Sequence, residues 1–153
     1  MTTVDQPIDY HKGRLLVSTD KTMLDLDVIH DYLSRSYWSA NVPREIVARS
    51  LEHAICFGVY DGQTQVGFAR VISDYATFAY LSDMFILEAH QRQGLGKWLL
   101  ACIIAHPDLH GLRRWMLVTS DAQGLYERYG FRTVEDGSNI MHILRLNIYG
   151  DVQ

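Results

Sequence analysis

The alternation of apolar and polar positions predicts a buried strand followed by a buried helix near the middle of the chain. Residues 78–87 are apolar or aromatic except at Ser82 and Asp83, which is typical of a strand inside a sheet. Residues 95–106 carry one apolar stripe at helical spacing, formed by Leu95, Leu99, Cys102 and Ile103. Pro107 is expected to end this helix, because proline has no backbone N–H to donate.

Before this unit, the pattern predicts two helices and a hairpin. Apolar residues at helical spacing cover residues 24–36, and Pro43 is expected to open a second helix because proline suits the first helical position. Two β-rich runs, residues 55–60 and 65–72, are separated by an Asp-Gly turn, which is a strong hairpin signal.

The two ends of the chain complete a mixed α/β pattern. Residues 1–12 are polar and unpatterned and are predicted to be a flexible segment, followed by a first strand at residues 14–18. The remaining predicted elements are a strand at 114–119, a helix at 121–129, and a closing strand pair at 131–134 and 140–146. Because no repeat or linker interrupts this order, residues 13–153 are expected to form one α/β domain with an α+β-type mixed sheet.

Composition and charge narrow the function classes. The 153 residues are 48% hydrophobic and 21% charged, and the net charge of -4 argues against a nucleic-acid surface. The N-terminus lacks a signal-peptide pattern, and no apolar segment approaches the roughly 20 residues that cross a bilayer. We therefore expect a cytoplasmic protein with neither nucleic acid nor membrane as a partner.

The cysteines and histidines predict no metal site. Cys56 and Cys102 lie in apolar surroundings and are expected to be reduced core residues, with a catalytic role as the alternative. His106 and His110 are four residues apart, but Pro107 breaks any helix between them.

The turn before the central helix carries a chemical signal. Gly94 and Gly96 permit positive φ and close approach, and the first helical turn has unpartnered amide hydrogens at the positive end of the helix dipole. Together they predict a phosphate or pyrophosphate site, with a plain strand-to-helix connection as the alternative. The stretch does not fit a P-loop, and Leu99 stands where a dinucleotide fingerprint needs glycine.

Two motifs, in the right order and spacing, carry a resemblance to a known family. Gln91-Arg92-Gln93-Gly94-Leu95-Gly96 fits Q/R-x-x-G-x-G/A, and residues 122–131 (AQGLYERYGF) fit A-x-x-L-Y-x-x-x-G-F. The sequence resembles the GNAT superfamily of N-acetyltransferases. The resemblance implies the acyl-CoA N-acyltransferase fold, with a central, mostly antiparallel sheet splayed between two parallel strands. It also implies acetyl-CoA as cosubstrate, without a metal.

The resemblance implies a coenzyme site on the strand and the following loop. Backbone groups of Met84, Phe85, Ile86 and Leu87 are expected to pair with the pantetheine, while their side chains pack in the core. The pyrophosphate is expected on the loop formed by Gln91, Arg92, Gln93, Gly94, Leu95, Gly96 and Lys97. The family more often has arginine and glycine at the first two of these positions. It also frequently has asparagine where Thr119 stands, so one coenzyme contact is expected to be altered.

Two side chains are expected to manage protons. The resemblance implies that Tyr126 protonates the departing thiolate, and the alternative is a tyrosine packed against the sheet. Asp83 is the first candidate for the base, because a carboxylate in an apolar strand is costly unless it is hydrogen-bonded or functional. A structural acceptor is the alternative role for Asp83, and Asp74 and His142 are weaker candidates for the base.

Acceptor recognition in the family usually comes from the first two helices and the hairpin. The residues expected to line that site are Tyr37, Trp38, Arg70, Asp74, Tyr75 and Tyr80. Aromatic walls with a few carboxylates suit a small cationic amine. We therefore expect direct acetyl transfer from acetyl-CoA to a primary amine of a small-molecule or amino-acid-like acceptor in a ternary complex. The alternatives are acetylation of a protein and a non-catalytic acyl-CoA-binding regulatory domain, and a homodimer is left open.

Overall fold

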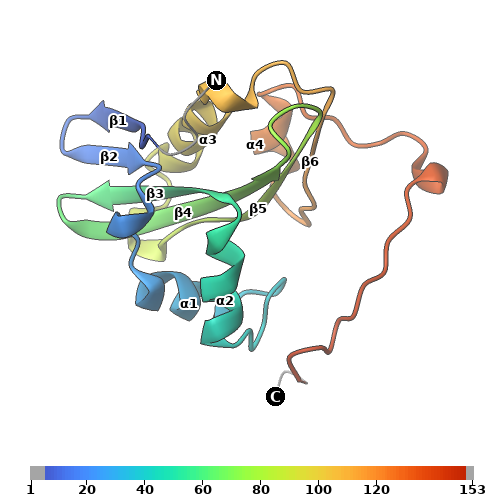
Figure 1. Cartoon of the computed structure of the whole chain (residues 1–153), viewed down its shortest axis with the longest axis horizontal. Helices are drawn as coiled ribbons and strands as arrows, with labels where there is room; N and C mark the ends of the chain where they lie inside the picture. The colour runs from blue at the N-terminus through green and yellow to red at the C-terminus, as the bar shows by residue number, and fades with distance from the viewer. Residues whose placement is uncertain (1–5, 151–153) are drawn as a thin grey trace.

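Residues 6–150 are described by a computed structural model, in which one six-stranded sheet carries helices on both faces (Figure 1). The strands are β1 (Asp9–Lys12), β2 (Leu15–Ser18), β3 (Ile55–Asp61), β4 (Thr64–Ser73), β5 (Phe78–Ile86) and β6 (Arg114–Met116). They lie across the sheet in chain order, and each neighbouring pair is antiparallel except β5 and β6, which are parallel. The expected mixed fold and its single parallel pair are confirmed.

The α-helices of the described chain are α1 (Leu26–Arg35), α2 (Arg44–Glu52), α3 (Leu95–Ala105) and α4 (Gln123–Glu127). Asp25 caps α1 by accepting hydrogen bonds from two amides of its first turn. Pro43 immediately precedes α2 as its N-cap residue, and α3 ends before Pro107 as expected. None of the helices within residues 6–150 is long and apolar enough to cross a membrane.

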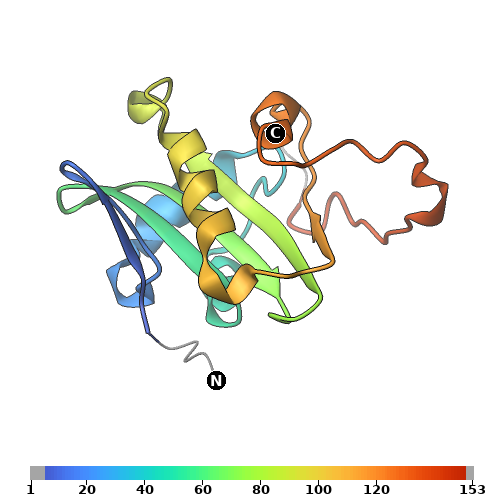
Figure 2. The ribbon, with the colours of Figure 1, turned by 90° about the horizontal axis from the view of Figure 1, so that it is seen from above.

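The sheet separates two apolar clusters. Figures 1 and 2 show α3 on one face and α1 with α2 on the other. The α3 face buries residues that include Phe57, Val71, Leu81, Leu99 and Ile103. The opposite face buries residues that include Ile29, Leu33, Val47, Phe68 and Phe85. Neighbouring residues of β4 point to opposite faces, as strand geometry requires, and this strand contributes to both clusters.

The two parallel strands separate after a short stretch of pairing. Only Phe78–Tyr80 of β5 pairs with β6, through Arg114–Met116, and β5 then continues to Ile86 beside β4 alone. The edge of β5 that faces β6 is therefore unpaired over its C-terminal half within the described sheet. This divergence is the splay expected between the parallel strands.

The N-terminal segment is more ordered than the sequence pattern indicates. Residues 9–12, part of the segment predicted to be flexible, form β1 and pair with β2. Strand pairing stabilises them through backbone hydrogen bonds, which leave no signature in the side-chain pattern. Residues 1–5 of that stretch lie outside the described residues.

The C-terminal part differs from the sequence expectation. The predicted strand pair at 131–134 and 140–146 is wrong for the described chain, because neither stretch forms a strand. Instead, the chain after α4 runs away from the sheet (Figure 1), in a path that is interrupted by a short 3-10 turn at Gly137–Asn139 and by a turn at residues 146–149. Its apolar side chains are exposed, and Met141 reaches 91% exposure.

Candidate active site

The regular pairing of β4 and β5 is interrupted at one position. This position follows the residues of β5 that pair with β6. Phe68 pairs with Phe85. The preceding pair joins Arg70 to Ser82, so β5 carries one residue more than β4 between the two pairs. Asp83 lies in this bulge with a φ of 56°, a left-handed conformation that costs a residue with a Cβ about 1–2 kcal/mol. A bulge redirects the neighbouring side chains and backbone groups, so β5 changes its orientation here.

Asp83 is engaged at both oxygens of its carboxylate. Oδ2 lies 3.0 Å from both Nε and Nη2 of Arg70, and Oδ1 accepts a 3.0 Å hydrogen bond from Nε1 of Trp38. The side chains of Asp83 and Arg70 are 7% and 15% exposed, and Arg70 also donates to Ser82 Oγ. A buried ion pair of this kind loses stability when one partner is removed. The geometry therefore favours the structural role of Asp83 over its role as the base.

Tyr126 reaches the same bulge from α4. Its hydroxyl lies 3.7 Å from Sδ of Met84, the residue after Asp83. The ring contacts Phe131 edge to face, with the ring centroids 5.9 Å apart. Burial raises the pKa of the Tyr126 phenol, and the nearby Tyr37 and Asp121 raise it further. At neutral pH the phenol is therefore protonated and able to donate a proton.

The loop after β5 presents free amides at the start of α3. Gly94 is the N-cap residue with a φ of 80°, and no side chain caps the helix. The first intrahelical bond links the Trp98 amide to the Gly94 carbonyl, so the three amides between them have no partner within the helix. Arg92 also has positive φ, 65°. Gly96 is helical rather than left-handed, and its added Cβ would lie 3.9 Å from the nearest atom, on Leu125.

The free amides at the start of α3 are suited to binding a pyrophosphate. Unpartnered amides at the positive end of a helix bind anions, and the residues from Arg92 to Gly94 are exposed. Gln91 is used differently, because its side-chain amide donates to the Ile86 carbonyl at 2.8 Å and ties the loop to β5. The loop therefore fits the diphosphate of a coenzyme, with its backbone as the binding group.

The strand segment expected to hold the pantetheine is packed by its side chains and open along one edge. Phe85 and Ile86 are buried, and Phe85 stacks on Tyr32 with the ring centroids 4.1 Å apart. Their backbones pair with β4, and the Leu87 amide donates to Val66. The edge turned toward β6 lies beyond the paired residues. The side chains of Phe85 and Ile86 therefore pack in the core, whereas the Ile86 carbonyl and the Leu87 amide are already engaged within the chain.

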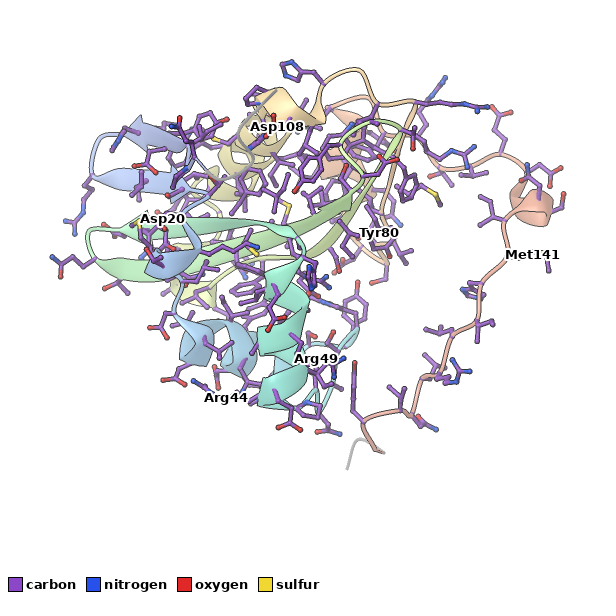
Figure 3. The ribbon with its side chains drawn as sticks, viewed as in Figure 1. Asp20, Arg44, Arg49, Tyr80, Asp108 and Met141 are labelled. Carbon is purple, nitrogen blue, oxygen red and sulfur yellow. The ribbon has the colours of Figure 1, made fainter. Side chains whose placement is uncertain are left out.

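Four of the six expected acceptor residues lie near the bulge. Trp38 and Arg70 contact Asp83 directly. Tyr37 contacts Trp38 edge to face, and its hydroxyl accepts a hydrogen bond from the Ser120 amide, which links the α1–α2 loop to the segment before α4. Tyr80 lies two residues before Ser82 on β5, on the side of the sheet that carries α2 (Figure 3). Tyr37 and Trp38 are 65% and 41% exposed, so the aromatic wall is accessible.

The other two expected acceptor residues lie elsewhere. Asp74 and Tyr75 form the turn between β4 and β5 and precede Asp83 by nine and eight residues. The part of β5 from Phe78 to Asp83 alone spans about 17 Å. Asp74 accepts hydrogen bonds from the amides of Ala76, Thr77 and Phe78 and from the Thr77 hydroxyl. These bonds, with the Thr77 hydroxyl first, hold the pKa of Asp74 far below its usual value. Asp74 therefore stabilises this turn, away from the bulge of β5.

Sequence reasoning did not predict how three side chains contribute to this site. Ser82 accepts from Arg70, and the side chain of Met84 contacts the Tyr126 hydroxyl. Thr119 accepts a 3.1 Å hydrogen bond from the amide of Ala122, the residue before α4. The adjacent polar residues Ser82 and Asp83 in an apolar strand were the available signal for the bulge.

The thiols and potential metal ligands lie apart from this arrangement. Cys56 and Cys102 are buried, and burial raises the pKa of each thiol to about 11. Both therefore carry neutral thiols at neutral pH and contribute to the core. Within residues 6–150, no group of three or more His, Cys, Asp or Glu side chains is arranged to hold a metal ion.

Known proteins share both the sequence and this architecture. A family model for the acetyltransferase (GNAT) domain matches residues 52–133. A Gibberella zeae protein whose name describes a candidate acetyltransferase is 36% identical over 149 residues, which cover 82% of this chain and 83% of that protein.

Solved structures agree with this match. A crystal structure of a candidate acetyltransferase of the GNAT family from Xanthomonas campestris pv. campestris is 45% identical with a TM-score of 0.88, covering 92% of this chain and 100% of that chain. A GNAT acetyltransferase from Elizabethkingia anophelis, solved with acetyl-CoA bound, shares the fold at 18% identity and a TM-score of 0.60, covering 81% of this chain and 80% of that chain. By its family match and its close relatives, the chain belongs to the GNAT family of acetyltransferases.

Proposed function

We propose that this protein transfers the acetyl group of acetyl-CoA to a primary amine of a small-molecule or amino-acid-like acceptor by direct attack in a ternary complex. The observation that carries the proposal is the convergence of Tyr126, Asp83 and Trp38 on the bulge of β5, beside the unpaired edge of that strand. The open amides at the start of α3 add a site for the diphosphate of the cosubstrate.

The chain's own groups divide the work of the reaction. In the transfer, the amine nitrogen forms a bond to the acetyl carbon and the carbon–sulfur bond breaks. Tyr126 gives its proton to the departing thiolate; because a phenol with a pKa of about 10 is a weaker acid than a thiol near 8.5, this transfer requires that the two groups are hydrogen-bonded in a dry gap. The proton that the attacking amine nitrogen loses goes to solvent, and solvent returns a proton to the Tyr126 phenolate. Backbone amides beside the bulge are placed to donate to the thioester oxygen as charge develops there.

The contacts that occupy both carboxylate oxygens of Asp83 affect which acceptor amines can react. An alkylamine with a pKa of about 10.4 needs about 4.6 kcal/mol to lose its proton at pH 7, whereas an α-amine near 7.8 needs about 1 kcal/mol. Because Arg70 and Trp38 occupy both oxygens of Asp83, we propose that Asp83 orients the acceptor wall and that acceptors of lower pKa are preferred. The exposed rings of Tyr37 and Trp38 suit an acceptor that carries a positive charge.

The test measures free thiol released from acetyl-CoA at pH 7 with a panel of amines. The panel contains α-amines, such as amino-acid amides and a short peptide with a free N-terminus, and alkylamines, such as a polyamine and an Nα-blocked lysine. We expect amine-stimulated thiol release, faster with the α-amines. Binding of acetyl-CoA without such release would identify a regulatory domain instead. Release with the blocked lysine alone, rising steeply with pH, would reverse the proposed preference.

A further inference from the structure

The loop between α1 and α2 is held in one conformation by its own hydrogen bonds. The Ser36 hydroxyl is buried and accepts a 3.1 Å hydrogen bond from the Ser39 amide. The Asn41 amide donates to the Ser34 carbonyl at 3.0 Å, which ties the far end of the loop back to α1. Because these backbone groups are satisfied within the loop and its neighbouring helix, the loop is a defined support for the side chains that it carries.

Two adjacent aromatic residues of this loop, Tyr37 and Trp38, contact two different segments. Trp38 donates from Nε1 to Asp83 in β5 at 3.0 Å, and the Tyr37 hydroxyl accepts a 3.3 Å hydrogen bond from the Ser120 amide, just before α4. The two rings meet edge to face, with the ring centroids 5.1 Å apart. In Figure 1 the loop projects from α1 and α2 toward the side of the molecule that carries β6 and α4. Together these two residues, the aromatic bridge, link β5 to the segment before α4.

The aromatic bridge spans the part of the splay that backbone pairing does not. β5 and β6 pair only through Phe78–Tyr80 and Arg114–Met116, and within the described chain no backbone hydrogen bond joins the rest of β5 to residues 117–122. The helix that follows, α4, has five residues and no side-chain cap. A helix of this length is not stable by itself and takes its direction from tertiary contacts. The position of α4 relative to β5 therefore depends on side chains.

Tyr126 itself attaches α4 to β5 only weakly. Its hydroxyl contacts Sδ of Met84 at 3.7 Å, and a thioether sulfur is a weak hydrogen-bond acceptor. The Ser120 amide precedes Tyr126 by six residues, and the Tyr37 phenol is close enough to Tyr126 to raise its pKa. Tyr37 can therefore fix the start of α4 while leaving the Tyr126 hydroxyl available to the sulfur of the coenzyme.

We propose that Tyr37 is a positioning residue for the transfer: its hydrogen bond with the Ser120 amide fixes the start of α4, so that the Tyr126 hydroxyl meets the departing sulfur. A misplacement of about 1 Å at a reacting group can cost about 100-fold in rate, so a single exposed hydrogen bond is enough to matter. Tyr37 exchanges no proton in this role. The assignment of Tyr126 as the acid rests on the proposed function, whereas the bond between Tyr37 and Ser120 does not.

Tyr37→Phe tests the role directly, because it removes the hydroxyl and keeps the ring that contacts Trp38. We expect kcat for amine-stimulated thiol release to fall about tenfold, while the KM for acetyl-CoA and for the acceptor changes less than about threefold. Tyr10→Phe is the matched control, since Tyr10 is a partly buried tyrosine of β1 at the opposite edge of the sheet, and it should keep its kcat. An unchanged kcat in Tyr37→Phe would overturn the proposal. A raised KM for the acceptor with kcat retained would also do so, because it would show that the hydroxyl binds the acceptor instead.

A double substitution separates positioning from an independent effect. If Tyr37 acts through Tyr126, adding Tyr37→Phe to Tyr126→Phe should lower kcat by less than about twofold further, because no proton donor is left to position. If the two single losses multiply instead, Tyr37 makes a separate contribution to the reaction and the positioning role is rejected.

Hydrogen exchange measures the link without any catalysis. In the chain without coenzyme, we expect Tyr37→Phe to speed exchange of the Ser120 amide and of the amides of α4 at least about fivefold, while the amides of α3 keep their rates. This measurement also separates the two proposals. If Tyr126→Phe keeps its kcat, the proposed acid fails and the positioning role fails with it. If Tyr126→Phe is impaired but exchange across residues 120–127 is unchanged in Tyr37→Phe, only the positioning role is overturned.

Discussion

Tyr126 and Tyr129 lie three residues apart, but their hydroxyl groups reach different parts of the molecule. Tyr126 contacts Met84 at the bulge of β5, whereas Tyr129 donates a 2.9 Å hydrogen bond to the Lys97 carbonyl in the first turn of α3. The first therefore points to the proposed reaction site, and the second joins the end of α4 to the proposed diphosphate site. The two phenols make a matched pair for separating chemistry from packing.

We expect Tyr126→Phe to lower kcat about 100-fold, because a positioned proton donor is lost while the ring and its contact with Phe131 remain. The KM for acetyl-CoA should change less than about threefold, since binding of the coenzyme does not require the proton. Steady-state thiol release measures both constants. Tyr129→Phe is the control and should keep its kcat; an equal loss there would assign the effect to the packing of α4.

The stability of the fold should depend on the ion pair of Asp83 with Arg70. Asp83→Asn keeps an acceptor for Trp38 but leaves the buried guanidinium without its counter-charge, so the free energy of unfolding should fall by about 2–3 kcal/mol. Urea unfolding measures this loss. When the rate is plotted against pH, the midpoint of its fall at low pH should not change, because the proposed role of Asp83 is to orient the acceptor wall rather than to accept a proton. Disappearance of that fall in Asp83→Asn would restore the carboxylate as the base.

Asp74 shows how one side chain can make stability depend on pH. Hydrogen bonds from the Thr77 hydroxyl and from backbone amides lower its pKa in the folded state, so its stabilising effect is complete above the unfolded pKa of about 3.9 and is lost as pH falls toward the lower folded value. We expect Asp74→Ala to lower stability at pH 7, with a smaller difference at pH 3. Urea unfolding at both values measures the change. Equal differences at both pH values would show that the carboxylate charge is irrelevant.

At the scale of elements, the loop into α3 combines a sharp backbone turn with open amides. Gly94 ends the loop in the left-handed region and leaves the helix without a side-chain cap. A side chain that bonded to these amides would compete with an anion. The same arrangement therefore leaves the helix end less stabilised by the chain itself and more available to a ligand.

Gly94→Ala tests this loop against a glycine elsewhere. Both Gly94 and Gly111 have positive φ, 80° and 76°, and an added Cβ would meet no atom within 4 Å at either position. Each substitution to alanine should therefore cost a similar strain of about 1–2 kcal/mol. We expect only Gly94→Ala to raise the KM for acetyl-CoA, by about tenfold, because relaxation of the strain would move the amides. Calorimetry with coenzyme A provides the corresponding Kd, and an equal effect at Gly111 would reject the assignment.

For the whole molecule, the sheet places the site between two independently packed halves. α3 covers one face and follows the diphosphate loop, while α1 and α2 cover the other face and the loop between them supplies Tyr37 and Trp38. The bulge of β5 lies between them and contacts both Trp38 and, through Met84, Tyr126. A change in the relative position of the two halves would therefore alter acceptor recognition and catalysis together.

Elements with strong local patterns were predictable from the sequence. The β3–β4 hairpin, the strand β5 and the helix α3 were expected close to their observed bounds, because periodicity, an Asp-Gly turn and a terminating proline act over a few neighbouring residues. The predicted strand at 114–119 is shortened to Arg114–Met116. Its remaining residues diverge from β5, and this divergence depends on the sheet rather than on residue preference.

Predictions at the ends of the chain failed for a related reason. Residues 9–12 lack a strand pattern but find a partner in β2, whereas residues 140–146 have the pattern but find no partner within the described chain. Strand formation depends on an available edge as well as on alternation, so the side-chain pattern alone predicts neither outcome.

The sequence by itself determined the order of the main elements, the glycine turn before α3, and the chemical types available for catalysis. Only the tertiary structure decided that Asp83 meets Arg70 and Trp38, that Tyr126 reaches the adjacent Met84, and that Asp74 stays in its turn. The physical reason is the separation along the sequence over which each interaction acts. Propensity, capping and turn chemistry act between near neighbours, whereas a bulge and the contacts of its side chains depend on the register of strands distant in the sequence.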